Sequence, residues 1–252
     1  MAKTKDYKSA ENVFDLLPIS ANIVLKNWKV FLAANILTIL AALSHLIPSD
    51  STANSDVTLN SVESFTGAQL DIFIGGIIFV AVTALVLYAY FYAAQTVTQV
   101  RTSRGESPTI KEVLSEGFQN LFGVVAVTFL SGAIIVGGLL LLIVPGIFAI
   151  ARLAFAPYIL IDQKLGVTDS MIESNRISKG KFGAVFAAIL VVLLIVIGAS
   201  ILGGIPFIGQ LAGAALTIAF SLVLPLRYLQ VRDANRAGSK NKQTVAPPPT
   251  VK

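Results

Sequence analysis

Arg152 is the residue whose chemical type fits its surroundings least, because it carries the only formal charge in the apolar stretch 120–161. A charged side chain inside a membrane span costs a few kcal/mol on insertion scales and is by default a candidate for function. Asp71, near the outer end of another predicted span, is a carboxylate that could reach a similar depth. We keep three alternatives: an Arg152–Asp71 ion pair, a site for an anion or lipid headgroup, and an arginine that extends to the surface along its own aliphatic stem.

The sequence offers no catalytic constellation. With no cysteine, disulfides, thiolate metal sites and a cysteine nucleophile are excluded. The single histidine, His45, argues against a histidine metal cluster or a Ser-His-Asp triad, and we expect it to be an interface residue. Because carboxylate pairs and nucleophile–base pairs are missing as well, we predict that the chain is not an enzyme and has no metal site and no cofactor.

The composition points to a membrane protein. Of 252 residues, 55% are hydrophobic and 13% are charged, against roughly 25% charged in an average soluble domain. The mean hydropathy is +0.77. About 20 apolar residues in a helix cross a ~30 Å hydrocarbon core, and the chain has several runs of that length. We therefore predict an all-α integral membrane fold with several spans.

Six spans can be placed by length, and polar segments flank them. The predicted spans are residues 28–47, 70–98, 120–143, 147–161, 182–202 and 207–226. Residues 1–27 form an N-terminal segment with an interfacial helix broken at Pro18, and residues 227–252 have the composition of a basic disordered tail. Two amphipathic surface helices are predicted, over residues 107–118, beginning at Ser107-Pro108, and over residues 168–178.

Prolines interrupt the apolar runs at places where a helix would turn or break. Val144-Pro145-Gly146 divides residues 120–161 into two spans, since proline lacks a backbone donor and glycine permits a turn. The candidate hinges are Pro145, Gly146, Pro157, Pro206 and Pro225. These prolines fit either discontinuous helices around a transported solute or ordinary turns and kinks.

The distribution of charge predicts the orientation. Of the 19 lysines and arginines, all but Arg152 lie in the N-terminal segment, near residues 101–111 and 164–181, or in the C-terminal tail. With six spans these regions share one side, so the positive-inside rule places both termini in the cytoplasm and the protein in the inner membrane. The formal charge of +5 is then explained by topology and anionic lipid, and nucleic-acid binding is not expected.

The chain also repeats itself. Similar segments open three parts of the chain, at residues 26–31, 119–124 and 179–184, and Pro157 and Pro225 occupy similar places near the ends of two return helices. We infer three hairpin units, each with a surface helix and two spans.

Four motifs between Leu142 and Phe182 carry a resemblance to a known family. They are LIVPGI (142–147), FAPYILID (155–162), GVTDSM (166–171) and SNRISKGKF (174–182). Their order resembles the bacterial multi-pass proteins related to the membrane domain of glycerophosphoryl diester phosphodiesterase. The resemblance implies six helices with a cytoplasmic helix between the fourth and fifth spans. The catalytic barrel of that phosphodiesterase has no counterpart here, so its activity is not implied.

These observations favour a non-catalytic function. We expect a membrane scaffold or accessory module that organises lipid or a partner membrane protein. The alternative is a small transporter or channel with a path near Arg152 and the proline-broken helices, which would require a polar, water-accessible cavity containing Arg152. A lipid- or partner-facing apolar groove would favour the scaffold. The sequence does not determine the oligomeric state.

Overall fold

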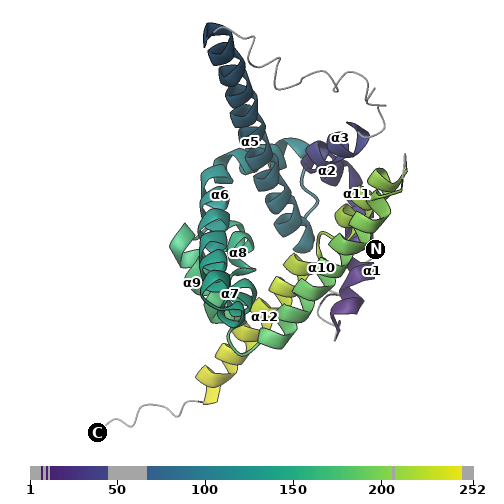
Figure 1. The fold of residues 1–252 in the computed structure, drawn as a ribbon. Coiled ribbons are helices and arrows are strands. Elements are labelled where there is room, and N and C mark those ends of the chain that lie inside the picture. The colour runs from purple at the N-terminus through teal and green to yellow at the C-terminus, as the bar shows by residue number, and fades with distance from the viewer. Residues whose placement is uncertain (1–6, 8–9, 11, 45–66, 206–207, 246–252) are drawn as a thin grey trace.

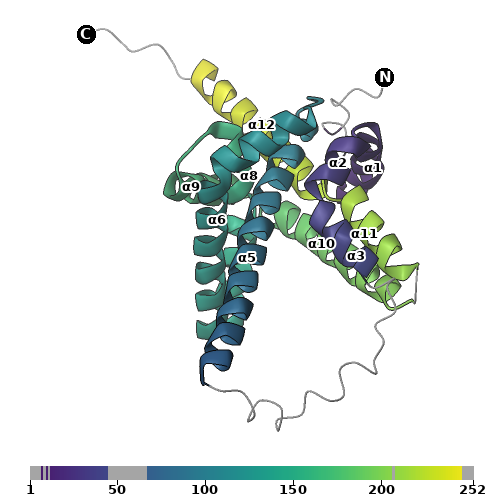
Figure 2. The same cartoon turned by 90° about the horizontal axis from the view of Figure 1, so that it is seen from above.

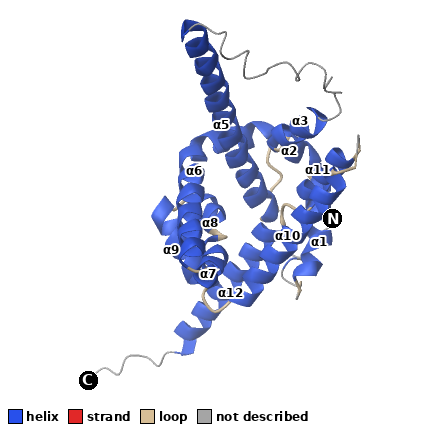
Figure 3. Cartoon of the chain, in the orientation of Figure 1, coloured by secondary structure: helices blue, strands red, loops and turns tan. Residues whose placement is uncertain are grey.

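The protein is a bundle of helices of unequal length (Figures 1 and 3). The computed structural model describes residues 7, 10, 12–44, 67–205 and 208–245, and this part of the chain contains no strand. Its helices are η2 (Val13–Asp15), α1 (Leu16–Lys26), α2 (Trp28–Ala34), α3 (Ile36–Ser44), α5 (Gly67–Ser103), α6 (Ile110–Leu141), α7 (Ile143–Leu153), α8 (Ala156–Gln163), α9 (Val167–Ser178), α10 (Phe182–Gly203), α11 (Gly209–Ala219) and α12 (Val223–Val245). The prediction of an all-α fold is confirmed for these residues.

Five helical segments of the described chain are long and apolar enough to cross a membrane. They are Leu70–Ser103 in α5, Ile110–Leu141 in α6, Ile143–Gln163 through α7 and α8, Phe182–Gly203 in α10, and Gly209–Ala237 through α11 and α12. This is the composition of a multi-pass membrane protein.

The first predicted span, residues 28–47, differs from the other five. It forms two short helices, α2 and α3, which meet at Asn35 with φ −107° and ψ 20°. The Asn35 amide donates a hydrogen bond of 2.9 Å to the Phe31 carbonyl, a local bond of the kind that competes with helix propagation. Asn27 marks the break between α1 and α2 in the same way, with a 3.0 Å bond to the Ile23 carbonyl. Residues 45–47 lie outside the described residues, as does His45.

The predicted surface helix at 107–118 is not a separate element. It is the first part of α6, which continues without a break into the third predicted span. The predicted start at Ser107-Pro108 is also wrong, because Thr109 is the N-cap. Its Oγ1 accepts from the Glu112 amide at 3.3 Å, and the Glu112 carboxylate accepts from the Thr109 amide at 3.2 Å. This reciprocal capping box fixes the start of the helix.

The turn between the third and fourth predicted spans is shorter than expected. A single extended residue, Leu142, separates α6 from α7, so Pro145 and Gly146 lie in the first turn of α7 and not between the helices. Proline is tolerated there because its missing donor would be unpaired in any case. Gly146 allows the two helices to approach closely: a Cβ built on Gly138 would lie 3.1 Å from the Gly146 Cα.

Two return segments are broken just before a proline. α7 ends at Leu153 and α8 begins at Ala156, with Pro157 in its first turn. The chain turns again between α11 and α12, with Pro225 in the first turn of α12. The hydroxyl of Ser20 on α1 bridges this second break, donating to the Ala219 carbonyl at 2.8 Å and accepting from the Leu222 amide at 3.3 Å. Pro206 lies outside the described residues.

The predicted disordered tail, residues 227–252, is wrong over most of its length, because α12 continues as a helix to Val245. The reason is tertiary packing. Tyr228, Leu229 and Val231 are all less than 5% exposed and belong to the largest cluster of buried side chains, together with Phe155 and Ile159.

The bundle is tightly packed at one end and splayed at the other. On α5, Ala93, Ala94, Val97 and Val100 are fully buried or nearly so, whereas the residues from Asp71 to Tyr88 are all exposed. Figure 2 shows α5 and α6 diverging from α3, α10 and α11 with distance from α12. We call the packed end the cationic end, because Arg101, Arg104 and Lys164 gather there.

The packing of α5 on α6 predicts that alanine substitutions at two glycines of α6 change the stability by different amounts. A Cβ on Gly117 would lie 2.8 Å from the Ala94 Cα on α5, whereas a Cβ on Gly132 would meet nothing within 4 Å. We expect Gly117→Ala to lower the free energy of unfolding by about 1–3 kcal/mol through overpacking. Gly132→Ala should leave it unchanged or raise it by up to about 1 kcal/mol. Denaturant unfolding of both variants in the same detergent tests this, and equal stability would contradict the packing of α5 on α6.

Candidate functional site

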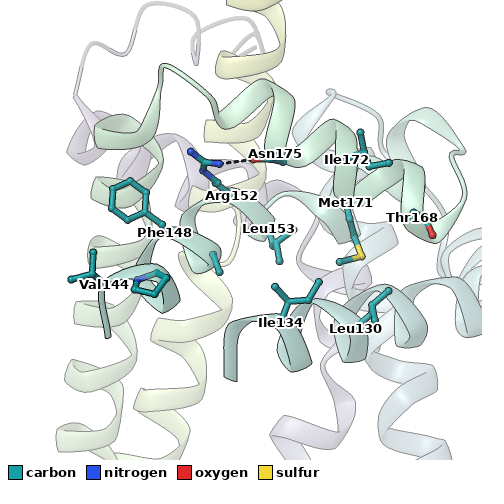
Figure 4. Close-up of a pocket in the computed structure, with 12 residues that line it drawn as sticks. Leu130, Ile134, Val144, Phe148, Arg152, Leu153, Thr168, Met171, Ile172 and Asn175 are labelled. Atoms are coloured by element: carbon teal, nitrogen blue, oxygen red, sulfur yellow. Dashed lines mark hydrogen bonds between the residues drawn. The ribbon is translucent and has the colours of Figure 1, made fainter. Parts of the chain in front are cut away.

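A groove lies between α6, α7 and α9 on the surface of the bundle (Figure 4). Its volume is about 780 Å³. The lining residues are Leu130, Ile134, Val144, Pro145, Phe148, Ala149, Arg152, Leu153, Thr168, Met171, Ile172 and Asn175. Nine of these are apolar, and Arg152 is the only charged one. The groove is therefore a hydrocarbon surface with one cation at its edge.

Arg152 is held beside α9 by two polar contacts. Its Nη1 donates to the Asn175 Oδ1 at 3.3 Å, and its backbone carbonyl accepts from the Ser174 hydroxyl at 2.7 Å. The side chain is exposed. Among the described residues no carboxylate forms an ion pair with Arg152, so its charge is balanced by solvent or by a molecule from the surroundings.

Phe148, which lines the groove, belongs to a stack of aromatic rings. Phe148 stacks on Phe182 with ring centroids 4.6 Å apart, and Phe182 stacks on Phe186 at 5.6 Å. This contact joins α7 to the start of α10. The preceding turn contains Lys179 and Lys181, which are exposed, and Gly180, whose φ of 82° suits glycine. Lys179 and Lys181 therefore lie beside the start of α10, where that helix contacts α7.

The structure does not bring the predicted partners Arg152 and Asp71 together. Asp71 is exposed in the first turns of α5, at the splayed end, and the rest of that helix separates it from Arg104 at the cationic end. Arg152 contacts α9 instead. Of the candidate hinges, Pro145 lines the groove, and Pro157 and Pro225 follow helix breaks. Hinge motion at these positions stays a prediction.

A second polar centre, around Asp162, lies at the cationic end. The side chain of Asp162, on α8, is 2% exposed. Arg104 donates from Nε to the carboxylate at 2.6 Å and from Nη2 to the Asp162 carbonyl at 2.7 Å. Arg232 donates to the other carboxylate oxygen at 2.6 Å, and the Tyr228 hydroxyl donates to the same oxygen. One carboxylate therefore joins the end of α5, α8 and α12.

The same network includes the N-terminal segment. Arg232 also pairs with Asp233 at 3.0 Å, and Asp233 accepts a 3.1 Å hydrogen bond from the Tyr7 hydroxyl. Burial and the neighbouring Asp233 carboxylate raise the pKa of Tyr7, so its hydroxyl stays protonated and donates. The side chain of Gln230 donates to the backbone carbonyls of Tyr7 and Ala10. Together we call these residues the Asp162 cluster.

Arg101, also at the cationic end, is compensated by carboxylates. Arg101 pairs with Glu106 at 2.7 Å, Glu116 at 3.1 Å and Glu112 at 3.3 Å. Arg152 differs from Arg101, Arg104 and Arg232 in this respect. Among the described residues Arg227 on α12 also forms no ion pair, but its partly buried guanidinium donates to the Ala184 carbonyl at 3.1 Å and to the Gln230 side-chain oxygen at 2.6 Å. Arg152 is instead exposed at the edge of the groove, where its charge can meet a ligand.

Sequence reasoning missed the Asp162 cluster. In the sequence, Asp162 is only the last residue of the motif FAPYILID, and Tyr228 and Arg232 fall within the predicted disordered tail. One signal was present: Asp162 follows an apolar span directly and lies among segments rich in lysine and arginine. A carboxylate at such a place has cations within reach, although the sequence alone cannot say which ones.

Comparisons with protein-family models, curated proteins and solved structures find no match for this chain. The resemblance to the phosphodiesterase-related membrane proteins therefore stays a prediction. Within the described residues, no group of three histidine, aspartate or glutamate side chains is arranged to hold a metal ion.

Three substitutions test the role of the Asp162 cluster. Asp162→Asn removes the buried carboxylate that Arg104 and Arg232 share and leaves each with one more exposed partner, Glu106 at 3.7 Å and Asp233 at 3.0 Å. It should lower the free energy of unfolding by about 3 kcal/mol. Tyr228→Phe removes one donor and keeps both ion pairs, so a smaller loss of about 1.5 kcal/mol is expected. Glu173→Gln breaks an ion pair with the exposed Arg176 and should cost less than about 1 kcal/mol. A loss for Asp162→Asn no larger than that for Glu173→Gln would show that the cluster does not hold the bundle together.

Proposed function

We propose that this chain is a non-catalytic, multi-pass inner-membrane protein that organises lipid, and that the groove between α6, α7 and α9 binds an anionic phospholipid. In this proposal the phosphate lies on Arg152 and an acyl chain lies along the groove. The single observation that carries the proposal is an apolar groove on the bundle surface with an uncompensated guanidinium at its edge.

The lining of the groove favours hydrocarbon as the occupant. Phe148 is 43% exposed and Ile172 is 61% exposed, on helices that border or belong to apolar spans. In a bilayer these side chains face lipid rather than water. A lipid chain in the groove gains dispersion contacts along its length, and no polar group has to lose water.

The charge at the edge favours an anion. A guanidinium forms two parallel hydrogen bonds to a phosphate, and such charge-assisted bonds are roughly twice as strong as neutral ones. Asn175, the side-chain partner of Arg152, is uncharged, so an incoming phosphate does not have to displace a carboxylate. The exposed Lys179 and Lys181 add positive charge near the start of α10.

The path of the chain supports six spans with both termini on one side. Tyr7 contacts Asp233 at the cationic end, whereas α5 begins at the splayed end. The chain therefore changes ends between α1 and α5. In the proposal α2 and α3 make this crossing despite the break at Asn35, and the positive-inside rule places the cationic end in the cytoplasm.

The transporter alternative receives less support from the same groove. A hydrophilic solute needs a polar, water-filled path with several hydrogen-bonding groups. The groove offers Arg152, Asn175 and Thr168 at its edge, and its remaining lining is apolar. A binding site for lipid is the better fit to this surface.

Arg152→Gln tests the lipid site. We expect the ratio of bound phosphatidylglycerol to bound phosphatidylcholine, measured by native mass spectrometry after purification from mixed lipids, to fall about tenfold. Arg152→Lys should restore part of it, since the charge remains but the paired donors do not. The matched control is Arg176→Gln on α9, where the arginine already has a carboxylate partner. An unchanged ratio for Arg152→Gln would end the proposal of a phosphate site.

The topology is testable because the chain has no cysteine. Three variants each carry one cysteine. Lys8→Cys and Ser55→Cys lie on either side of the first predicted span, and Lys181→Cys marks the cationic end. With six spans, a membrane-impermeant maleimide added to intact cells should label the variant at position 55. It should label those at positions 8 and 181 only after permeabilisation. Labelling of positions 8 and 55 from the same side would exclude the crossing by α2 and α3.

A further inference from the structure

A second cavity lies at the splayed end, between α3, α5, α10 and α11. Its volume is about 930 Å³. Its lining consists of Leu37, Thr38, Ala41, Ala42, Ala84, Leu87, Tyr88, Val196, Ala199, Ser200, Gly203, Gln210, Gly213, Ala214 and Thr217. We call it the splayed-end cleft. None of these residues lines the Arg152 groove, so the two cavities are separate.

One wall of the cleft is formed by two closely packed helices, and the other by an exposed stretch of α5. A Cβ on Gly213 of α11 would lie 2.6 Å from the Ala199 carbonyl oxygen on α10, so these two helices are in close contact. Across the cleft, Leu87 is 46% exposed and Tyr88 is 63% exposed on the half of α5 that has left the bundle. The described side chains therefore leave the space between α5 and the α10–α11 wall unfilled.

The residues that line the cleft are uncharged. No lysine, arginine, aspartate or glutamate lines the cleft, in contrast to the Arg152 groove. Oxygen and nitrogen are supplied by hydroxyl and amide groups: Thr38, Tyr88, Ser200, Gln210 and Thr217. Ser200, Gln210 and Thr217 already donate to carbonyls of the α10–α11 wall, at 2.9 Å in each case, which leaves their oxygens as acceptors.

We infer that the splayed-end cleft binds an uncharged lipid of the diacylglycerol class. Acyl chains fit against Leu37, Leu87 and Val196, and a free hydroxyl finds acceptors on the α10–α11 wall. A phosphate in the same place would lose water and meet no counter-charge, which costs several kcal/mol. The cleft selects against charge for the same physical reason that the Arg152 groove selects for it.

The test uses the single tryptophan of the chain, Trp28. In a Trp28→Phe background, Tyr88→Trp reports on the cleft and Phe148→Trp reports on the Arg152 groove. Each variant is placed in phosphatidylcholine vesicles that contain a minor fraction of either diacylglycerol or phosphatidic acid with brominated acyl chains. The two probes differ only in the phosphate, and the bromines quench tryptophan fluorescence on contact.

At equal mole fraction, we expect diacylglycerol to quench the reporter at position 88 about threefold more strongly than phosphatidic acid does. Adding Ala214→Phe, which fills the cleft, should abolish this preference without changing quenching at position 148. Equal quenching by both probes at position 88 would overturn the inference. Protection of position 88 from brominated phosphatidylcholine as well would mean that protein covers the cleft, and would also overturn it. The reporter at position 148 should prefer phosphatidic acid, so a failure of the proposed function is seen separately.

Discussion

Two guanidiniums and a phenol converge on the buried carboxylate of Asp162, and they come from the two ends of the chain's membrane region. Arg104 follows α5, whereas Tyr228 and Arg232 belong to α12. A buried carboxylate without these donors would be costly, and the arginines without the carboxylate equally so. The mutual requirement specifies one arrangement of α5, α8 and α12. Through Asp233 and Tyr7 it also determines where the N-terminal segment lies.

This constraint explains why the bundle is packed at one end only. Near the Asp162 cluster, small residues such as Ala94 and Gly117 let α5 and α6 come into contact, and side chains from Ala93 to Val100 are buried. Apolar side chains do not draw helices together in lipid, because lipid tails are equally apolar. The contacts given for the described residues include no comparable polar cluster at the far end, where α5 separates from the α10–α11 pair. The cleft is a consequence of where the polar contacts are.

Hydropathy predicted the long apolar helices, which depend on composition. It missed the helix breaks and extensions that depend on particular side-chain contacts. Five of the six predicted spans coincide with long apolar helices, because a run of about 20 apolar residues has few other stable forms. The break at Asn35 and the extension of α12 past Arg227 were missed, since each depends on neighbours distant in the sequence or on a local side-chain bond. Arg152 was recognised from its isolation, but its partner could not be. Asn175 reaches it only because α9 packs across α6, α7 and α8.

The two cavities differ in the charge of their linings, and in a membrane this difference is decisive. Both offer hydrocarbon walls, so shape alone would let either take an acyl chain. In the low-dielectric region between helices, however, a single charge outweighs many apolar contacts, because its solvation is worth several kcal/mol and each contact only ~0.1–0.2 kcal/mol. In the proposed function, the guanidinium of Arg152 is therefore enough to direct an anion to one groove. An uncharged lining is enough to exclude it from the other. If both proposals hold, a bundle held together by one buried carboxylate presents two lipid surfaces of different selectivity.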